Sequence, residues 1–166
     1  EKELVVQLRT VELGTPTKQY VSDYAEVRVD PSLINTSTDA SIATNVKFPS
    51  PNYLEAGKEY AIVLLCPSST KYKVWIARMG EPTIETRSLG EGSQAIISKQ
   101  YLGGSLFKSQ NGTIWSPSQF EDLKFKLYKC EFITNTTADL TLYNSKLSSN
   151  NKRDLKLSSN AIRVYP

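Results

Sequence analysis

The sequence predicts an all-β protein, an antiparallel β-sandwich of jelly-roll type with one or two short helical turns. Three observations support this class: the apolar runs have the length of strands, turn-forming Ser, Thr, Asn and Pro separate them, and no stretch sustains a helical period. The chain has 166 residues, of which 39% are hydrophobic, so it can bury one domain core. We expect residues 1–133 to form the sandwich. Residues 134–166 are expected to be a C-terminal β and loop extension, either part of the same domain or the start of a next one.

The first strands are expected in the N-terminal third. Residues 4–8 form an apolar run, residues 24–29 alternate between apolar and charged side chains, and residues 42–48 are a weaker candidate. The strictest alternation places Val27 and Val29 on one face of their strand, so this strand should have one solvated side.

The middle of the chain contains the strongest strand pattern. Residues 60–66 are continuously apolar, which indicates a strand with both faces covered. Residues 67–70 supply a turn, and residues 72–79 then read as the hairpin partner of that strand. We expect Trp75, in the middle of this second strand, to pack against the core or the sheet face, and Trp115 to cover a corner further along the chain.

Asn111-Gly112 lies between apolar runs at residues 102–108 and 113–115, and this dipeptide is the strongest short hairpin signal because both residues tolerate positive φ. Ser116, Pro117 and Gln119 then have the spacing of a capped helix start, with room for a single turn.

A long strand is expected over residues 123–132. Its apolar side chains change face along the run, which indicates a bulge or passage between two layers. Further strands are expected around residues 140–142 and 161–165.

The residue types argue against catalysis. Histidine is absent, which excludes the Ser-His-Asp triad, the Cys-His dyad and every histidine-bearing metal site. No P-loop, GxGxxG or EF-hand loop occurs. The carboxylate pairs Glu55 and Glu59, Glu81 and Glu85, and Glu121 and Asp122 are interpreted as loop charges rather than as acid–base pairs. We therefore expect no enzyme activity, no cofactor and no metal site. Cys66 and Cys130 both lie in apolar runs and are expected to be buried free thiols.

The charge and apolar patterns limit the partners. Twenty basic residues meet 17 acidic ones, a balance that does not fit a nucleic-acid reader, and no apolar run reaches the length of a membrane span. Two groups of residues are candidates for contact with partners, aromatic residues beside turns and basic residues near the C-terminus. They are Tyr24, Tyr53, Tyr101, Lys146, Lys152, Arg153 and Lys156. The pentapeptide KLSSN at residues 146–150 recurs at 156–160, which indicates either two similar loops or a polar arm that docks on a neighbouring chain.

Two stretches carry a family resemblance. The first is FPSPNYLEAGKEYAIVLL (residues 48–65) with residues 72–81, and the second is GSLFKSQNGTIWSPSQFEDLKFKL (residues 104–127). Residues 8–16 fit the same pattern. Together, over roughly residues 5–132, the chain resembles a domain of large tail and baseplate proteins of contractile-tailed bacteriophages.

This resemblance implies a non-enzymatic virion component, assembled in the bacterial host cytoplasm into the phage tail. Its expected partners are other virion proteins in a homo- or hetero-oligomeric assembly, and no catalytic residue comes with the resemblance. One alternative is a carbohydrate- or receptor-binding β-sandwich module of a virion or surface protein, which would contact a host surface glycan. An enzyme with paired carboxylates in a cleft is a third.

Overall fold

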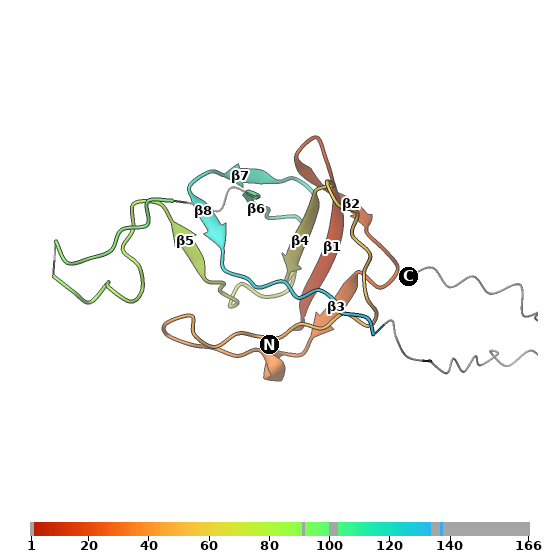
Figure 1. Cartoon of the computed structure of the whole chain (residues 1–166), viewed down its shortest axis with the longest axis horizontal. Coiled ribbons are helices and arrows are strands. Elements are labelled where there is room, and N and C mark those ends of the chain that lie inside the picture. Colours follow the sequence, from red (N-terminus) through yellow and green to blue (C-terminus); the bar gives the residue numbers. More distant parts are fainter. Residues whose placement is uncertain (1, 91, 100–102, 134–136, 138–166) are drawn as a thin grey trace, which may run out of the picture. The chain divides into compact units, whose positions relative to one another are not determined.

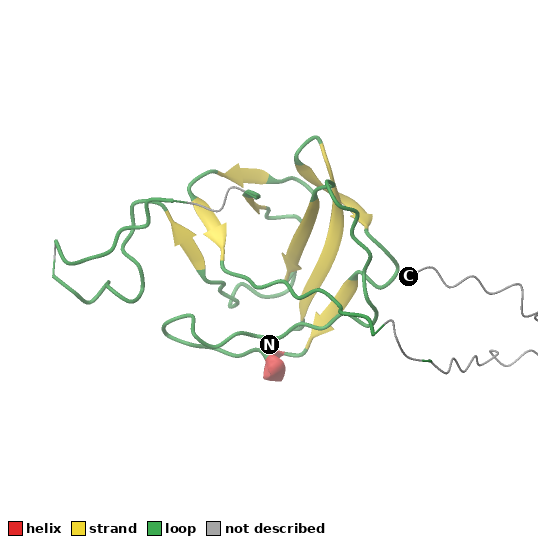
Figure 2. Cartoon of the chain, in the orientation of Figure 1, coloured by secondary structure: helices red, strands yellow, loops and turns green. Residues whose placement is uncertain are grey.

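The computed structural model describes residues 2–90, 92–99, 103–133 and 137, and it is all-β with antiparallel strand pairing (Figures 1 and 2). The chain divides into two units, Glu1–Cys130 and Glu131–Pro166. The strands and the one short helical turn of the described residues all lie in the first unit. They are β1 (Leu4–Glu12), β2 (Thr15–Tyr20), β3 (Glu26–Val29), the 3₁₀ turn η1 (Pro31–Leu33), β4 (Tyr60–Leu65), β5 (Ile76–Arg78), β6 (Leu106–Lys108), β7 (Ser116–Ser118) and β8 (Glu121–Leu123).

Strand β1 is the centre of the main sheet. β4 pairs with it from Val5 to Thr10, and a strand has only two edges, so β2 and β3 must share the other edge. Leu8 lies at their junction, where its N–H donates to the Ala25 carbonyl at 2.8 Å and its carbonyl accepts from Val21 N–H at 3.1 Å. β2 and β3 thus act as one return strand, interrupted by a short loop in which Ala25 is fully buried.

Both faces of β1 are covered. Val6 and Leu8 are buried on one face together with Val29, and Gln7 and Arg9 are buried on the other face. The register places Val63 of β4 opposite Gln7, so the second face combines one buried apolar side chain with two buried polar ones. The core of the main sheet is therefore small, and half of it is polar.

Two smaller sheets complete the described fold. β5 pairs with β8, and β6 pairs with β7. The expected hairpin between residues 60–66 and 72–79 is wrong, because β4 joins β1 and only Ile76–Arg78 of the second run forms a strand. A long-range partner displaced the nearby one, since β1 offers β4 six consecutive pairing positions.

Other expectations fail for local reasons. The helix start at residues 116–119 is instead β7, where Pro117 is tolerated because the strand belongs to a two-stranded sheet with free edges. The helical turn occurs at η1, where Asp30 accepts a hydrogen bond from Ser32 N–H at 2.8 Å. The long strand over 123–132 is limited to β8, and residues 42–48 form no strand. The strands expected at 140–142 and 161–165 lie outside the described residues.

The hairpin expected around Asn111-Gly112 is present, but its second strand begins three residues later than expected, at β7. Gly112 has φ +66, which confirms the expected positive φ at this residue. Cys66 and Cys130 are both free. Cys66 is half-buried, whereas Cys130 is exposed, so its expected burial is wrong. Trp75 is exposed as well, because the ladder that would have covered it ends beside it.

Candidate interaction surface

Two of the aromatic contact candidates lie on loops that are joined by hydrogen bonds. Tyr24 and Tyr53 are exposed, as expected. Ser22 Oγ donates to Asn52 Oδ1 at 2.5 Å, and Asn52 Nδ2 reaches the Tyr24 carbonyl at 3.5 Å. The loop before β3 and the loop before β4 therefore present one exposed tyrosine each at neighbouring positions. The remaining candidates, Tyr101, Lys146, Lys152, Arg153 and Lys156, lie outside the described residues.

A buried carboxylate that the sequence does not single out joins the two smaller sheets. The Glu121 side chain is only 4% exposed. Its Oε1 accepts from Arg78 Nε at 3.0 Å and from Arg78 Nη2 at 2.5 Å. Its Oε2 accepts from Ser118 Oγ at 2.8 Å and from Lys108 Nζ. We call these four residues the Glu121 clamp, and they come from β5, β6, β7 and β8.

The Glu121 clamp is fixed in its ionised form. The hydrogen bond from Lys108, followed by those from Ser118 and Arg78, lowers the pKa of Glu121 from 4.5 to about 2. The same contact raises the pKa of Arg78. A carboxylate with this pKa cannot donate a proton near neutral pH, and both of its oxygens are already engaged. The arrangement therefore holds strands together.

A second polar cluster lies on the face of the main sheet that carries Gln7 and Arg9. Arg9 Nε donates to Gln7 Oε1 at 2.8 Å, and Gln7 Nε2 donates to Glu26 Oε2 at 2.7 Å. Tyr20 donates its hydroxyl to the same Glu26 oxygen at 3.1 Å. Burial first, and then this bond to Glu26, raise the pKa of Tyr20. We call these four residues the polar seam. Each buried polar group in it is hydrogen-bonded, which removes the cost of burying it unpaired.

The polar seam also ties a distant loop to the sheet. Arg9 Nη1 donates to the Gly112 carbonyl at 3.2 Å and to the Thr17 carbonyl at 3.3 Å. The loop itself is closed by Asn111, whose Oδ1 accepts from the Thr113 and Ile114 N–H groups at 2.9 and 2.8 Å. Arg9 thus positions the β6–β7 loop over the sheet.

Two open hollows border these features. One, of about 440 Å³, lies against the Glu121 clamp and is also lined by Met79 and Phe120. The other, of about 550 Å³, lies between Gln110 and the turn that follows β4. Among the described residues, no three His, Cys, Asp or Glu side chains gather in a way that could hold a metal ion. No helix in the described part of the chain is long and apolar enough to cross a membrane.

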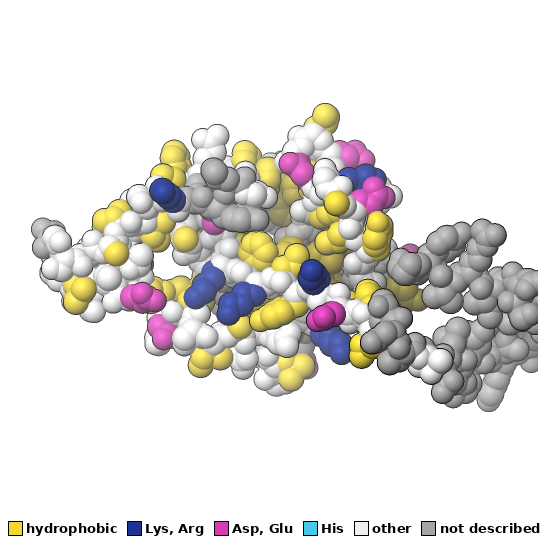
Figure 3. All heavy atoms as spheres, viewed as in Figure 1, with side chains coloured by type: hydrophobic (Ala, Val, Ile, Leu, Met, Phe, Trp, Pro, Cys, Tyr) yellow, Lys and Arg dark blue, Asp and Glu magenta, His cyan; other side chains and the backbone are white. Residues whose placement is uncertain are grey.

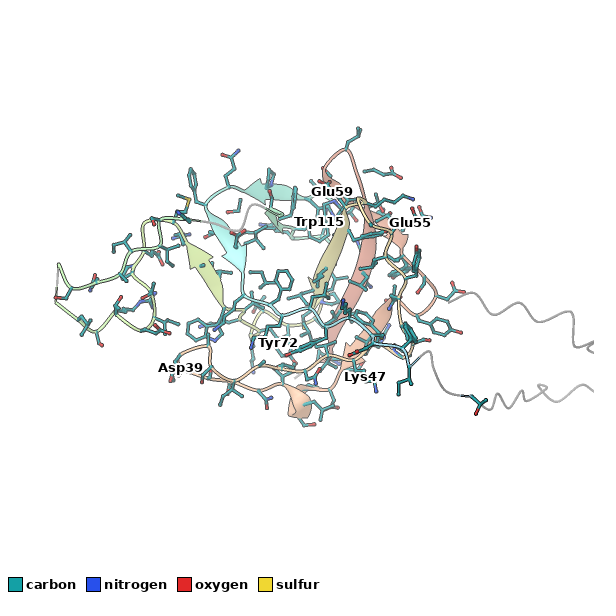
Figure 4. The ribbon with its side chains drawn as sticks, viewed as in Figure 1. Asp39, Lys47, Glu55, Glu59, Tyr72 and Trp115 are labelled. Atoms are coloured by element: carbon teal, nitrogen blue, oxygen red, sulfur yellow. The ribbon has the colours of Figure 1, made fainter. Side chains whose placement is uncertain are left out.

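The carboxylate pairs interpreted as loop charges lie apart from both hollows' linings. Figure 4 places Glu55 and Glu59 near the start of β4, and Asp39 and Lys47 toward the other end of that strand. Glu55 forms an ion pair with Lys58 at 2.6 Å, and this contact raises the pKa of Lys58. The arrangement of a glycosidase, with two carboxylates facing each other across a cleft, is not found at this pair.

The described surface is unusually rich in large apolar side chains. Five hydrophobic residues are buried among the described residues, whereas twenty large hydrophobic ones are exposed. Figure 3 shows apolar side chains and Lys or Arg side chains intermixed across the middle of one face. Comparison with protein-family models, curated proteins and solved structures finds no match to this chain, so these surface properties carry the functional argument.

Proposed function

We propose that this chain is a non-enzymatic structural domain of a bacteriophage tail or baseplate protein and that it acts by contacting other virion proteins. The imbalance between five buried and twenty exposed large hydrophobic residues supports this proposal. A surface of this kind is typical of proteins that bury it against neighbours. In this proposal the small sheets are the layers of a jelly-roll-like β-sandwich.

The internal charges support the same function. The Glu121 clamp and the polar seam link strands that are distant in the sequence, and their hydrogen bonds are made within the chain. Such groups stabilise a shape and leave the surface to make contacts. The repeated KLSSN segments at 146–150 and 156–160 are a further candidate contact region, outside the described residues.

The test is localisation in the particle. Antibodies raised against the 166-residue chain should label the tail or baseplate in purified particles of the phage that encodes it, viewed by immunogold electron microscopy. Peptides of the chain should also be recovered from those particles by mass spectrometry. Absence of both label and peptides from purified particles would refute the virion assignment.

A second candidate function is recognition of a host surface glycan. The observation that favours it is the placement of exposed Tyr24 and Tyr53 on two hydrogen-bonded loops. Aromatic rings stack on the apolar faces of sugars, and two such rings on neighbouring loops could form a short platform.

Binding to a glycan array tests this candidate. A positive signal should be lost in both Tyr24→Ala and Tyr53→Ala, and kept in Tyr128→Ala, which removes another exposed tyrosine. Equal binding by all three variants would place the glycan site elsewhere.

A further inference from the structure

The segment that follows β8 has the composition of a strand, and its side chains are exposed. Phe125 is 53% exposed, Leu127 64%, Tyr128 80% and Phe132 72%. Aromatic and aliphatic residues alternate here with Lys126, Lys129 and Glu131. A run of this kind fits a pleated, half-buried surface, so exposure leaves its apolar side chains without their usual environment.

The backbone of the same segment is also without a partner. The last ladder bond of the β5–β8 pair joins Lys124 N–H to the Trp75 carbonyl at 2.9 Å. No backbone hydrogen bond links residues 125–133 to any other described residue. In Figure 1 the chain continues beyond β8 without a strand arrow. Exposed backbone with strand-forming side chains is a template for pairing with another strand.

The sequence of this segment is complementary to itself when two copies run antiparallel. In one register, each facing pair combines side chains that attract each other: two aromatic rings, a base with an acid, two apolar groups, and a cation with an aromatic ring. The pairs are Phe125 with Phe132, Lys126 with Glu131, Leu127 with Cys130, and Tyr128 with Lys129. Twofold symmetry repeats each pair, so the eight residues give eight favourable facing pairs.

Neighbouring registers lose this match. A shift that places Tyr128 opposite itself sets Phe125 against Glu131 and Leu127 against Lys129, and Lys126 then has no acid to face. Register in a strand pair is chosen by such facing contacts, so the complementary arrangement is selected.

We propose that residues 125–132 pair with the same residues of a second copy, forming an antiparallel two-stranded ribbon about a twofold axis. The occupant is a second copy because the Lys126–Glu131 charge complementarity and the aromatic ends are supplied by the segment itself. The ribbon buries little area, which places it among weak and transient interfaces unless other contacts of the assembly add to it. This proposal deepens the proposed assembly role and names one of its partners.

A charge-exchange series tests the register. Lys126→Glu and Glu131→Lys each set like charges opposite each other, and each should raise the dimer dissociation constant of the full chain at least fivefold in sedimentation equilibrium. The double variant restores the opposite charges and should return to within twofold of the parent chain. Lys124→Glu is the matched control, because its facing residue is Ile133 and its own charge change meets no partner charge.

A disulfide trap tests the same register independently. In a Cys66→Ser background, Leu127→Cys places a thiol opposite Cys130 of the second copy, within the Cα separation that a disulfide allows. Oxidation with diamide should give a covalent dimer. Tyr128→Cys is the matched control, because its side chain lies on the other face of the ribbon and should give far less.

A chain that remains monomeric up to its solubility limit, with no excess of cross-linking in the Leu127→Cys variant, would overturn the proposal. A dimer that is unaffected by the charge exchange would do the same, since it would have to form elsewhere. Neither result touches the virion assignment, which the immunogold and peptide experiments decide separately.

Discussion

Four hydrogen bonds converge on the Glu121 carboxylate, two from Arg78 and one each from Lys108 and Ser118. At the scale of single residues, this group has the clearest energetic role in the described fold. Its partners come from three other strands, so losing its charge weakens four elements together. Gly112 has a comparable role in the backbone, because its positive φ sets the path of the β6–β7 loop.

The low pKa of Glu121 makes stability depend on pH. Because this pKa is about 2 in the folded chain against an ordinary value of 4.5, the stabilisation is complete above about pH 4.5 and is lost as the pH falls toward 2. We expect the urea midpoint to fall over that window, and Glu121→Gln to lower the midpoint at pH 7 and flatten its acid dependence. Glu12→Gln, an exposed carboxylate with no described ion pair, is the control and should keep the parent profile.

Gly112→Val should destabilise the chain by about 1–2 kcal/mol, the cost of placing a side chain in the left-handed region. The new Cβ would also meet Leu65 Cδ2 at 3.4 Å. Urea denaturation measures the change, with Gly104→Val as the control, since a Cβ at Gly104 meets nothing within 4 Å and no positive φ constrains it. Equal midpoints for the two variants would mean that the loop tolerates a side chain.

At the scale of elements, the fold is set by which strands meet and where their ladders end. The β1–β2 hairpin turns through Leu13 and Gly14, with φ of +50 and +71. The β5–β8 ladder ends after Trp75 and Lys124. Continuing its register would set Val74 against Phe125 and then Lys73 against Lys126, so like charges oppose each other where the ladder stops.

Leu13→Asn should stabilise the chain by about 1 kcal/mol, because Asn tolerates positive φ far better than Leu does and Asn-Gly is the favoured pair for such a turn. The Leu13 side chain is fully exposed, so its removal opens no cavity. A rise in thermal midpoint is the expected readout. Leu33→Asn, also at an exposed leucine but with ordinary φ, should not give that rise.

Lys73→Glu should let the β5–β8 ladder extend, since an acid would then face Lys126. Such a pair contributes about 0.2–1 kcal/mol. We expect new protection from hydrogen exchange at residues 73–75 and 124–126. Lys71→Glu makes the same charge change outside the continued register and should leave these amides unprotected. Protection in neither variant would mean that charge does not end the ladder.

At the scale of the first unit, β1 organises the described fold. It pairs along both edges, and both of its faces are buried between Val6 and Arg9. The smaller sheets are joined through the Glu121 clamp, and the β6–β7 loop is tied to the main sheet through Arg9. Local stability should therefore decrease from β1 outward to the unpaired segment after β8.

Native-state hydrogen exchange measures this gradient. The amides of residues 6–9 should exchange slowest, and those of residues 125–132 should exchange fast in dilute solution. If the proposed ribbon forms, protection of residues 125–132 should rise with protein concentration while that of residues 6–9 stays constant. Uniform protection across both segments would contradict the gradient.

The sequence by itself determined the all-β class, the positions of β1, β3 and β4, and the positive φ of Gly112. These features depend on local properties, namely short apolar runs, alternation and the conformational freedom of glycine. The exposure of Tyr24 and Tyr53 followed from their neighbouring turn residues in the same way. The continuous run at residues 60–66 predicted the strand, but it carried no information on which strand would pair with it.

Only the tertiary structure decided the pairing and the buried charges. β4 chose β1 over the nearby residues 72–79, and β5 chose β8, because pairing depends on edges supplied by distant parts of the chain. Glu121 resembled any loop carboxylate until the ends of three other strands brought Arg78, Lys108 and Ser118 to it. The run at residues 123–132 has strand-forming side chains throughout, yet most of it stays unpaired because a strand also needs a neighbour with free hydrogen-bonding groups and compatible charges.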